Sequence, residues 1–106
     1  GEIMEILRDK TINTGDVKPQ DKIIKNITGN TISIQIDGDA KLSMKGSHAN
    51  FESNNSYAIA LINMTTLDKV TETTTPGLYL AIVEGIDEME LEISGSGVIH
   101  WKELGD

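Results

Sequence analysis

The sequence predicts an all-β fold, an antiparallel β-sandwich of the jelly-roll kind with about eight strands. First, the chain contains 15 Ile, 4 Val and 10 Thr, residues that are stiff at χ1 and pack well on a pleated sheet. Second, from about residue 22 onward, short runs of alternating apolar and polar residues are broken every 8 to 12 residues by Gly, Asn, Asp or Ser. Third, 106 residues leave room for one hydrophobic core.

The clearest strand covers residues 31–36, where Ile32, Ile34 and Ile36 fall on one face and polar residues on the other. Asp37-Gly38-Asp39 then supplies turn residues, and residues 41–45 alternate again. The two runs therefore predict a β-hairpin.

The middle of the chain is less regular. Residues 46–55 are rich in Gly, Ser and Asn and predict a loop. Residues 56–64 are apolar on both faces, which predicts a central strand. Residues 67–73 form a weaker run, followed by a Thr cluster and the Pro76-Gly77 turn.

The last third of the chain alternates strands with Gly-containing turns. We expect strands over residues 78–83, 89–93 and 98–102, the second with Glu90 and Glu92 facing solvent and the last containing Trp101. The turns of the predicted fold contain five structural glycines, Gly38, Gly77, Gly85, Gly95 and Gly97.

The N-terminal part is open to two interpretations. We expect residues 1–20 to form an N-terminal arm or edge strand and residues 21–106 to form the sandwich domain. Because Ile3, Met4, Ile6 and Leu7 have near-helical spacing, a short helix is the alternative.

Composition and charge exclude several classes of partner. The formal net charge is -8 and the chain has one Arg, so binding to a phosphate backbone, and hence to nucleic acid, is not expected. No apolar run approaches the roughly 20 residues of a membrane span, so no membrane partner is expected. Since cysteine is absent, disulfides, thiolate metal sites and Cys nucleophiles are excluded.

Two segments carry a resemblance to a known class of protein. Residues 77–86 contain a Gly-Leu-Tyr strand start and an apolar-Glu-Gly-apolar corner, and residues 89–99 form an alternating strand and a Gly-containing turn into the final strand. With the Asp37-Gly38 turn and residues 42–47, this pattern resembles small structural proteins of tailed bacteriophages. Members often carry Arg where this chain has Leu80 and Glu90 or Glu92, so we do not expect this chain to have the surface that those arginines form.

The resemblance implies a β-sandwich used as a head-decoration, head-fibre or tail-accessory protein. We therefore expect a non-enzymatic virion protein, made in the bacterial cytoplasm, that associates with a capsid, neck or tail lattice. Its expected partners are other phage structural proteins and further copies of itself, with a trimer as a guess for the homo-oligomer.

Residues with catalytic or metal-binding chemistry form no recognisable motif. His48 and His100 lack a second ligand at metal-site spacing, and no Gly-x-Ser-x-Gly motif is present. The acidic run at residues 84–92 predicts a solvated face, with a small enzyme as a third hypothesis. We therefore expect no catalytic residue, no cofactor and no metal ligand.

Two aromatic residues support a rival function. Tyr57 and Trp101 are candidate surface-binding residues, since exposed aromatic rings on a sandwich can stack on sugars. The alternative to a virion structural protein is therefore a carbohydrate- or host-surface-binding module.

Overall fold

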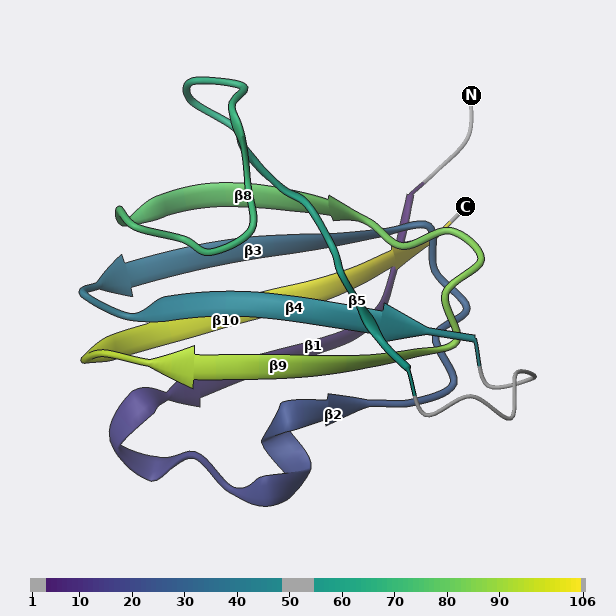
Figure 1. The fold of residues 1–106 in the computed structure, drawn as a ribbon, viewed down its shortest axis with the longest axis horizontal. Helices are drawn as coiled ribbons and strands as arrows, with labels where there is room; N and C mark the ends of the chain where they lie inside the picture. Colours follow the sequence, from purple (N-terminus) through teal and green to yellow (C-terminus); the bar gives the residue numbers. More distant parts are fainter. Residues whose placement is uncertain (1–3, 49–54, 106) are drawn as a thin grey trace.

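Two antiparallel sheets pack face to face in the computed structural model, which describes residues 4–48 and 55–105 (Figure 1). Sheet A contains, in spatial order, β1 (Glu5–Asn13), β10 (Gly97–Gly105), β3 (Thr31–Gly38), β8 (Gly77–Ile82), β6 (Leu61–Asn63) and β7 (Lys69–Val70). Sheet B contains β2 (Ile23–Ile24), β9 (Glu88–Ser94), β4 (Lys41–Ser47) and β5 (Tyr57–Ala58). Two 3₁₀ turns, η1 (Thr14–Asp16) and η2 (Pro19–Lys22), connect β1 to β2. The predicted all-β sandwich is confirmed.

The order of the strands is that of a jelly roll. When β6 and β7 are set aside, the chain changes sheet at every connection except the one from β4 to β5. This places β1-β10-β3-β8 over β2-β9-β4-β5, the order of two interleaved Greek keys. β6 and β7 extend sheet A beyond β8, so the described chain has ten strands rather than about eight.

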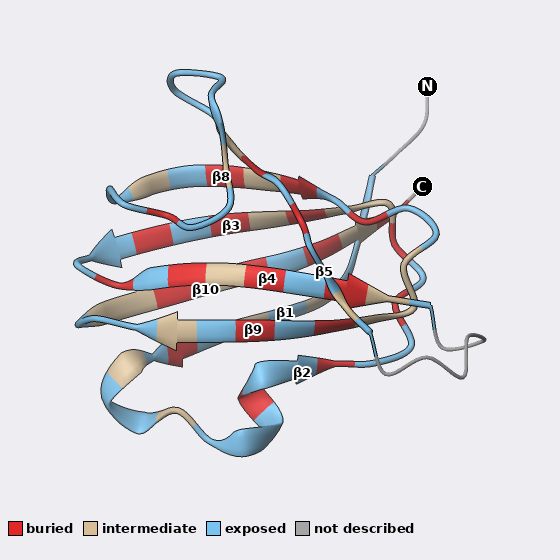
Figure 2. Ribbon diagram, viewed as in Figure 1, coloured by how far each residue is buried: buried red, intermediate tan, exposed pale blue. Residues whose placement is uncertain are grey.

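Alternation along the strands fills the space between the sheets, where buried residues recur at every second position (Figure 2). Ile32, Ile34 and Ile36 of β3 are at most 1% exposed, and Leu42 and Met44 of β4 face them from sheet B. Burying a large aliphatic side chain stabilises the fold by roughly 1.5–3 kcal/mol, so this period-two pattern sets which face of each strand points inward.

The predicted hairpin over residues 31–45 is wrong. β3 pairs with β10 and β8, whereas β4 pairs with β9 and β5, so the Asp37-Gly38-Asp39 segment is a corner between the two sheets. Asp39 N donates to Ser96 O (2.8 Å), which joins this corner to the equivalent corner between β9 and β10. Gly38 has a φ of +71°. Such a positive φ occurs in hairpin turns and in corners between sheets, so it does not distinguish the two.

The predicted central strand over residues 56–64 is also wrong. The chain makes β5 on the edge of sheet B, then crosses over and makes β6 in sheet A. Ile59 and Leu61 are buried at the crossing, which explains why the run is apolar although it is not one strand. β4 continues to Ser47 and so occupies the first two residues of the predicted 46–55 loop; residues 49–54 lie outside the described part.

The weak strand predicted over residues 67–73 is limited to β7, and the Thr cluster after it has a structural role. Thr73 is fully buried; its N–H donates to Leu42 O (2.9 Å), and its Oγ1 accepts from Leu42 N (3.0 Å). Tyr79 Oη donates to Thr75 O (2.7 Å). The two Thr73 bonds attach the segment between β7 and β8 to β4, and the Tyr79 bond attaches it to β8.

The N-terminal segment forms a strand, so the alternative of a short helix is wrong. β1 pairs with β10 along its length, from Glu5 opposite Gly105 to Asn13 opposite Val98. The first and last strands of the chain therefore lie side by side.

The five predicted turn glycines lie at the ends of strands or between them. Four have positive φ, namely Gly38, Gly77, Gly85 and Gly95. At Gly97 the requirement is space rather than φ, because a Cβ there would overlap the carbonyl oxygen of Asp37.

Candidate binding surfaces

The histidines and acids singled out from the sequence are dispersed. His100 Nδ1 lies 2.9 Å from Thr11 Oγ1, and its Nε2 lies 3.4 Å from Asp37 Oδ2. His48 Nδ1 lies 3.8 Å from Asp87 Oδ2. Across residues 4–48 and 55–105, no three His, Asp or Glu side chains are placed to hold a metal ion. The same part of the chain contains no helix long and apolar enough to cross a membrane.

The outer face of sheet B is charged. Glu90 and Glu92 of β9 are exposed, as predicted, and Lys41 and Lys45 of β4 lie on the same face. Lys45 Nζ lies 3.3 Å from Glu92 Oε1, with both side chains about half exposed or more. This is a solvated strand face with a surface ion pair, the kind that contributes little to stability.

Trp101 does not provide a stacking surface, which corrects the prediction that it binds a ligand. It is 6% exposed and faces the core from β10, between Lys10 of β1 and Ile34 of β3. Its neighbour Ile99 is also buried, as the alternation of this strand requires. Trp101 is therefore a core residue.

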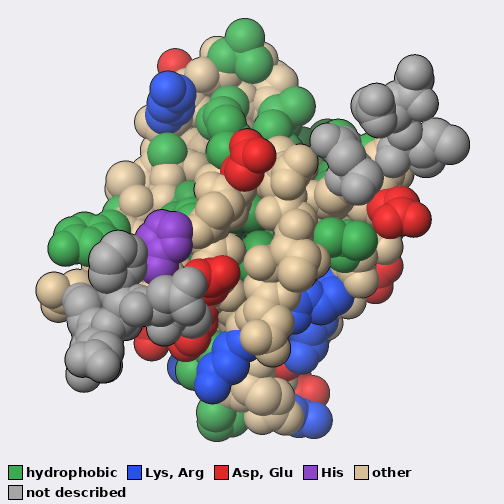
Figure 3. Space-filling model, turned by 90° about the vertical axis from the view of Figure 1, so that its right-hand side faces the viewer, with side chains coloured by type: hydrophobic (Ala, Val, Ile, Leu, Met, Phe, Trp, Pro, Cys, Tyr) green, Lys and Arg blue, Asp and Glu red, His purple; other side chains and the backbone are tan. Residues whose placement is uncertain are grey.

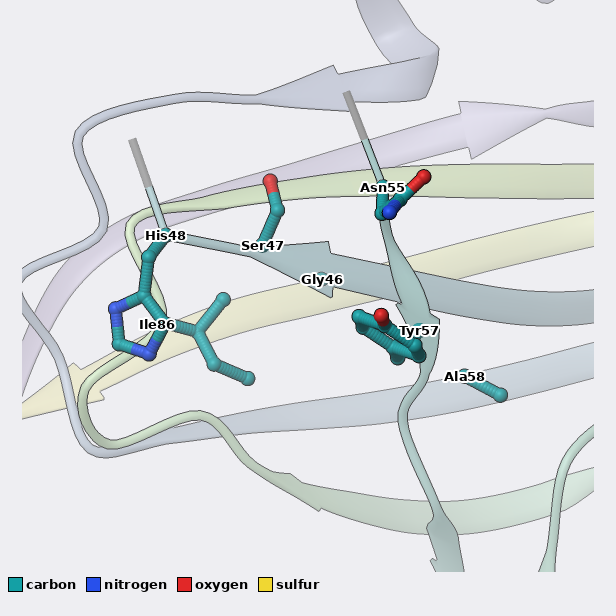
Figure 4. Close-up of a pocket in the computed structure, with 7 residues that line it drawn as sticks. All are labelled: Gly46, Ser47, His48, Asn55, Tyr57, Ala58 and Ile86. Carbon is teal, nitrogen blue, oxygen red and sulfur yellow. The ribbon is translucent and has the colours of Figure 1, made fainter. Parts of the chain in front are cut away.

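Tyr57 is exposed and borders a hollow. The ring is 71% exposed, and the hollow, of about 440 Å³, is lined by Gly46, Ser47, His48, Asn55, Tyr57, Ala58 and Ile86. Figure 4 shows the Tyr57 ring on the β5 side of this space and the Ile86 and His48 side chains on the other side. The lining is mainly apolar, with hydroxyl, imidazole and amide groups around it, so a flat ring of a ligand has a partner for stacking here.

The same hollow brings Ser47 and His48 close to Asp87 without forming a hydrolytic triad. Figure 4 shows the Ser47 hydroxyl and the His48 ring pointing to opposite sides of the chain. A Ser-His-acid site requires the imidazole within hydrogen-bond reach of the hydroxyl. Ser47, His48 and Asp87 are therefore not arranged as a Ser-His-acid triad.

A second surface, on the outer side of sheet A, was not predicted from the sequence. Leu78 and Ile82 of β8 are 52% and 60% exposed, and Leu80 between them is partly exposed. Ile62 of β6 lies opposite Leu80 on the same side of the sheet, and Met64, whose N–H donates to Leu78 O, is 49% exposed. We call these five residues the apolar face.

The apolar face lies beside polar residues of the same sheet. Toward β1 the outer side of sheet A holds the polar group formed by Thr11, His100, Gln35 and Asp37, and Lys69 lies opposite Ile62 on the other flank. Figure 3, which views the molecule from its right-hand end, shows several hydrophobic side chains in its upper part, among polar and charged ones. An apolar centre with a polar rim is the usual composition of a protein interface.

A buried carboxylate organises the inner side of β10. Glu103 is 1% exposed and accepts from Arg8 Nε (2.5 Å), Gly29 N (2.8 Å) and Thr28 N (2.9 Å). Burial alone raises the pKa of Glu103, but these hydrogen bonds outweigh it and hold the pKa below its ordinary value. Arg8 Nη1 also donates to Lys25 O (2.8 Å), so the network fixes the connection between β2 and β3 against sheet A.

A second ion pair fixes the connection between β1 and β2. Lys10 forms a salt bridge with the buried carboxylate of Asp21, which also accepts from Lys18 N (2.9 Å). The Lys10 ammonium, followed by the Lys18 N–H, lowers the pKa of Asp21. Both networks have a structural role, since the buried carboxylate of each is already paired with a cation.

Comparison with known proteins shows a shared fold. No protein-family model and no curated protein sequence matches this chain. The crystal structure of the SPBc2 prophage-derived protein YomS is similar, with a TM-score of 0.63 over 98% of this chain and 96% of that chain. Because 9% of the aligned residues are identical, the likeness extends to the fold alone.

Proposed function

We propose that this chain is a phage-associated structural protein that acts by binding other proteins and not by catalysis. The observation that carries the proposal is the apolar face of Ile62, Met64, Leu78, Leu80 and Ile82. The outer side of a sandwich sheet ordinarily carries polar residues, because one face of each strand meets water. An apolar cluster there has a use when another protein covers it.

The energetics favour a covered face. The largest apolar patch on a typical soluble monomer measures roughly 300–600 Å² and is often functional, and burial contributes roughly 25 cal/mol for each Å² removed from water. The exposed aliphatic side chains contribute nothing to the core, since the inward positions of β8 are held by Tyr79 and Ala81. Their apolar character therefore supports association rather than folding.

Two further findings support a setting in a phage particle. Residues 31–101 resemble small structural proteins of tailed phages, and a prophage-derived protein shares the fold over nearly the whole chain. We propose a place in the virion as a head-decoration, head-fibre or tail-accessory component.

The proposal is tested on particles of a phage that encodes this chain. Mass spectrometry of purified particles should detect the protein at a stoichiometric level, and tagged protein should bind to particles that lack it. The Leu78→Lys/Ile82→Lys variant should fold but fail to bind. Absence from purified particles, or undiminished binding by the variant, would refute the proposal.

A second candidate function rests on the hollow beside Tyr57. The exposed ring and the polar groups around it suit a sugar, with the ring stacking on its apolar side. Glycan-array binding that is lost in Tyr57→Ala and retained in Leu78→Lys/Ile82→Lys would favour this function. Trp101→Ala is not informative here, because its side chain is buried.

A further inference from the structure

We infer that the occupant of the apolar face is a second copy of this chain, packed face to face about a two-fold axis that passes near Leu80. The inference rests on the proposed function in one respect, namely that the apolar face is a binding surface. It adds the identity of the partner on this face and the residue at the centre of the contact; particle binding then depends on the dimer rather than on direct contact through the apolar face.

The arrangement of the apolar face suits a two-fold contact. A two-fold interface uses the same patch on both subunits, so the patch must be complementary to itself. On β8 the outward residues are Leu78, Leu80 and Ile82, with Leu80 in the middle. Rotation about an axis near Leu80 places Leu78 of one copy against Ile82 of the other and the two Leu80 side chains together.

The charge distribution also favours a second copy of this chain as the partner. The chain has a net charge of -8, yet the charged residues on the outward positions of sheet A are balanced, with Asp9 and Asp37 against Lys69 and Lys102. Two copies can therefore approach through this side without the repulsion that other contacts between acidic surfaces would meet. A basic partner would instead be attracted to the acidic surfaces elsewhere.

The available area is comparable to that of a small specific dimer interface. Sheet A has six strands; at roughly 4.8 Å between strands and roughly 3.3 Å per residue, its outer side presents on the order of 600 Å² in projection. Specific interfaces bury about 600–1,000 Å² of accessible surface on each partner, so a dimer through this side would use most of it. The apolar face would form the centre of this contact and the polar residues near β1 its rim.

Because the chain contains no cysteine, single-cysteine variants test the contact directly. Leu80→Cys should be cross-linked to a dimer by a bismaleimide with a span of roughly 10 Å, since sheets packed face to face lie roughly 10 Å apart, which is farther than a disulfide bridges. Ile23→Cys is the matched control: Ile23 is 42% exposed on a strand of sheet B and this variant should remain monomeric on a denaturing gel. Sedimentation equilibrium of the unmodified protein should give twice the sequence mass at micromolar concentrations, and Leu78→Lys/Ile82→Lys should give the sequence mass.

Each result decides the inference. A monomer throughout the micromolar range, a trimer, or a dimer that cross-links in the Ile23→Cys variant and not in the Leu80→Cys variant would overturn it. If the purified chain is monomeric while Leu78→Lys/Ile82→Lys still loses binding to particles, the second copy is wrong and the proposed function stands. If both self-association and particle binding are unaffected by that variant, both are wrong.

Discussion

The outer sides of the two sheets differ in residue composition, although both inner sides pack into the core. Both sheets bury aliphatic residues at alternate positions, with Ile34 in sheet A and Leu42 in sheet B as examples. Outward, sheet B carries Glu90, Glu92 and Lys45, whereas sheet A carries the apolar face. Contact with solvent accounts for the first surface, whereas the proposed function explains the second as a surface that another protein covers.

Because of this difference, stability and the proposed association depend on different residues of the molecule. Core packing and the Glu103 network hold sheet A together from within, while the apolar face contributes to neither. Substitutions can therefore affect one property without the other, which makes the comparison testable.

The largest effect is expected from Glu103→Gln. This change leaves the Arg8 guanidinium without its charged partner, and removing one member of a buried ion pair typically costs about 3–5 kcal/mol; an amide retains some hydrogen bonds, so we expect a loss of roughly 2–4 kcal/mol in the free energy of unfolding. Urea denaturation measures it. Glu92→Gln, the same change on the outer side of sheet B, should cost less than about 0.5 kcal/mol. Equal costs at the two positions would contradict the network described for β10.

The Leu78→Lys/Ile82→Lys variant should have the opposite profile. We expect the dimer to weaken by about a hundredfold or more, equivalent to about 2.7 kcal/mol, because four ammonium groups would enter a contact between apolar surfaces. The free energy of unfolding of the monomer should stay within about 0.5–1 kcal/mol of the original, as for exposed positions. A large fall in the melting temperature would show instead that these residues belong to the core.

Acid should destabilise the fold by protonating the buried carboxylates of Glu103 and Asp21. The pKa values of Glu103 and Asp21 are lowered in the folded protein, so the folded state binds fewer protons than the unfolded chain in the acid range. Their stabilisation is complete above the ordinary carboxyl pKa, near 4.5 and 3.8, and is lost as the pH falls through the lowered values. Urea midpoints between pH 7 and pH 3 should fall in the original chain and fall less steeply in Glu103→Gln.

The smallest effect is expected on sheet B. Glu90→Lys alters the charge of an exposed strand position and should leave the dimer dissociation constant within about twofold at physiological ionic strength, where exposed charges are screened beyond roughly 8 Å. Sedimentation measures the constant. A large change in the dissociation constant would indicate that the dimer contact lies on sheet B and not on sheet A.

Alternation allowed the strands to be predicted, but not their partners. Residues 31–36 and 41–45 are strands with the inward faces expected, yet they belong to different sheets. The Gly38 turn is compatible with a hairpin or a corner, and the corner is decided by Ser96 and Gly97, which lie far along the chain. Strand pairing of this kind is non-local and leaves little trace in a short window of sequence.

The candidate surfaces were predicted in part. Tyr57 lies at an exposed position as expected, but Trp101 shares the inward parity of Ile99 and Glu103 and is buried. The sequence does indicate the apolar face: residues 78–83 are apolar at every position, although a sandwich strand needs apolar residues on one side only. Which of the two sides stays uncovered depends on the position of sheet B, and that is a property of the assembled fold.

The pairing of β1 with β10 also bears on how the protein is made. Among the described residues, β1 pairs in sheet A with β10, which is translated after all the other strands, so sheet A cannot be completed before β10 has been made. Ile12 of β1 and Ile32, Ile34 and Ile36 of β3, which are buried in the finished sandwich, lack their β10 neighbours until β10 has left the exit tunnel. The sandwich should therefore fold only after β10 has been made, and translation products truncated before β10 should be substrates for chaperones and proteases.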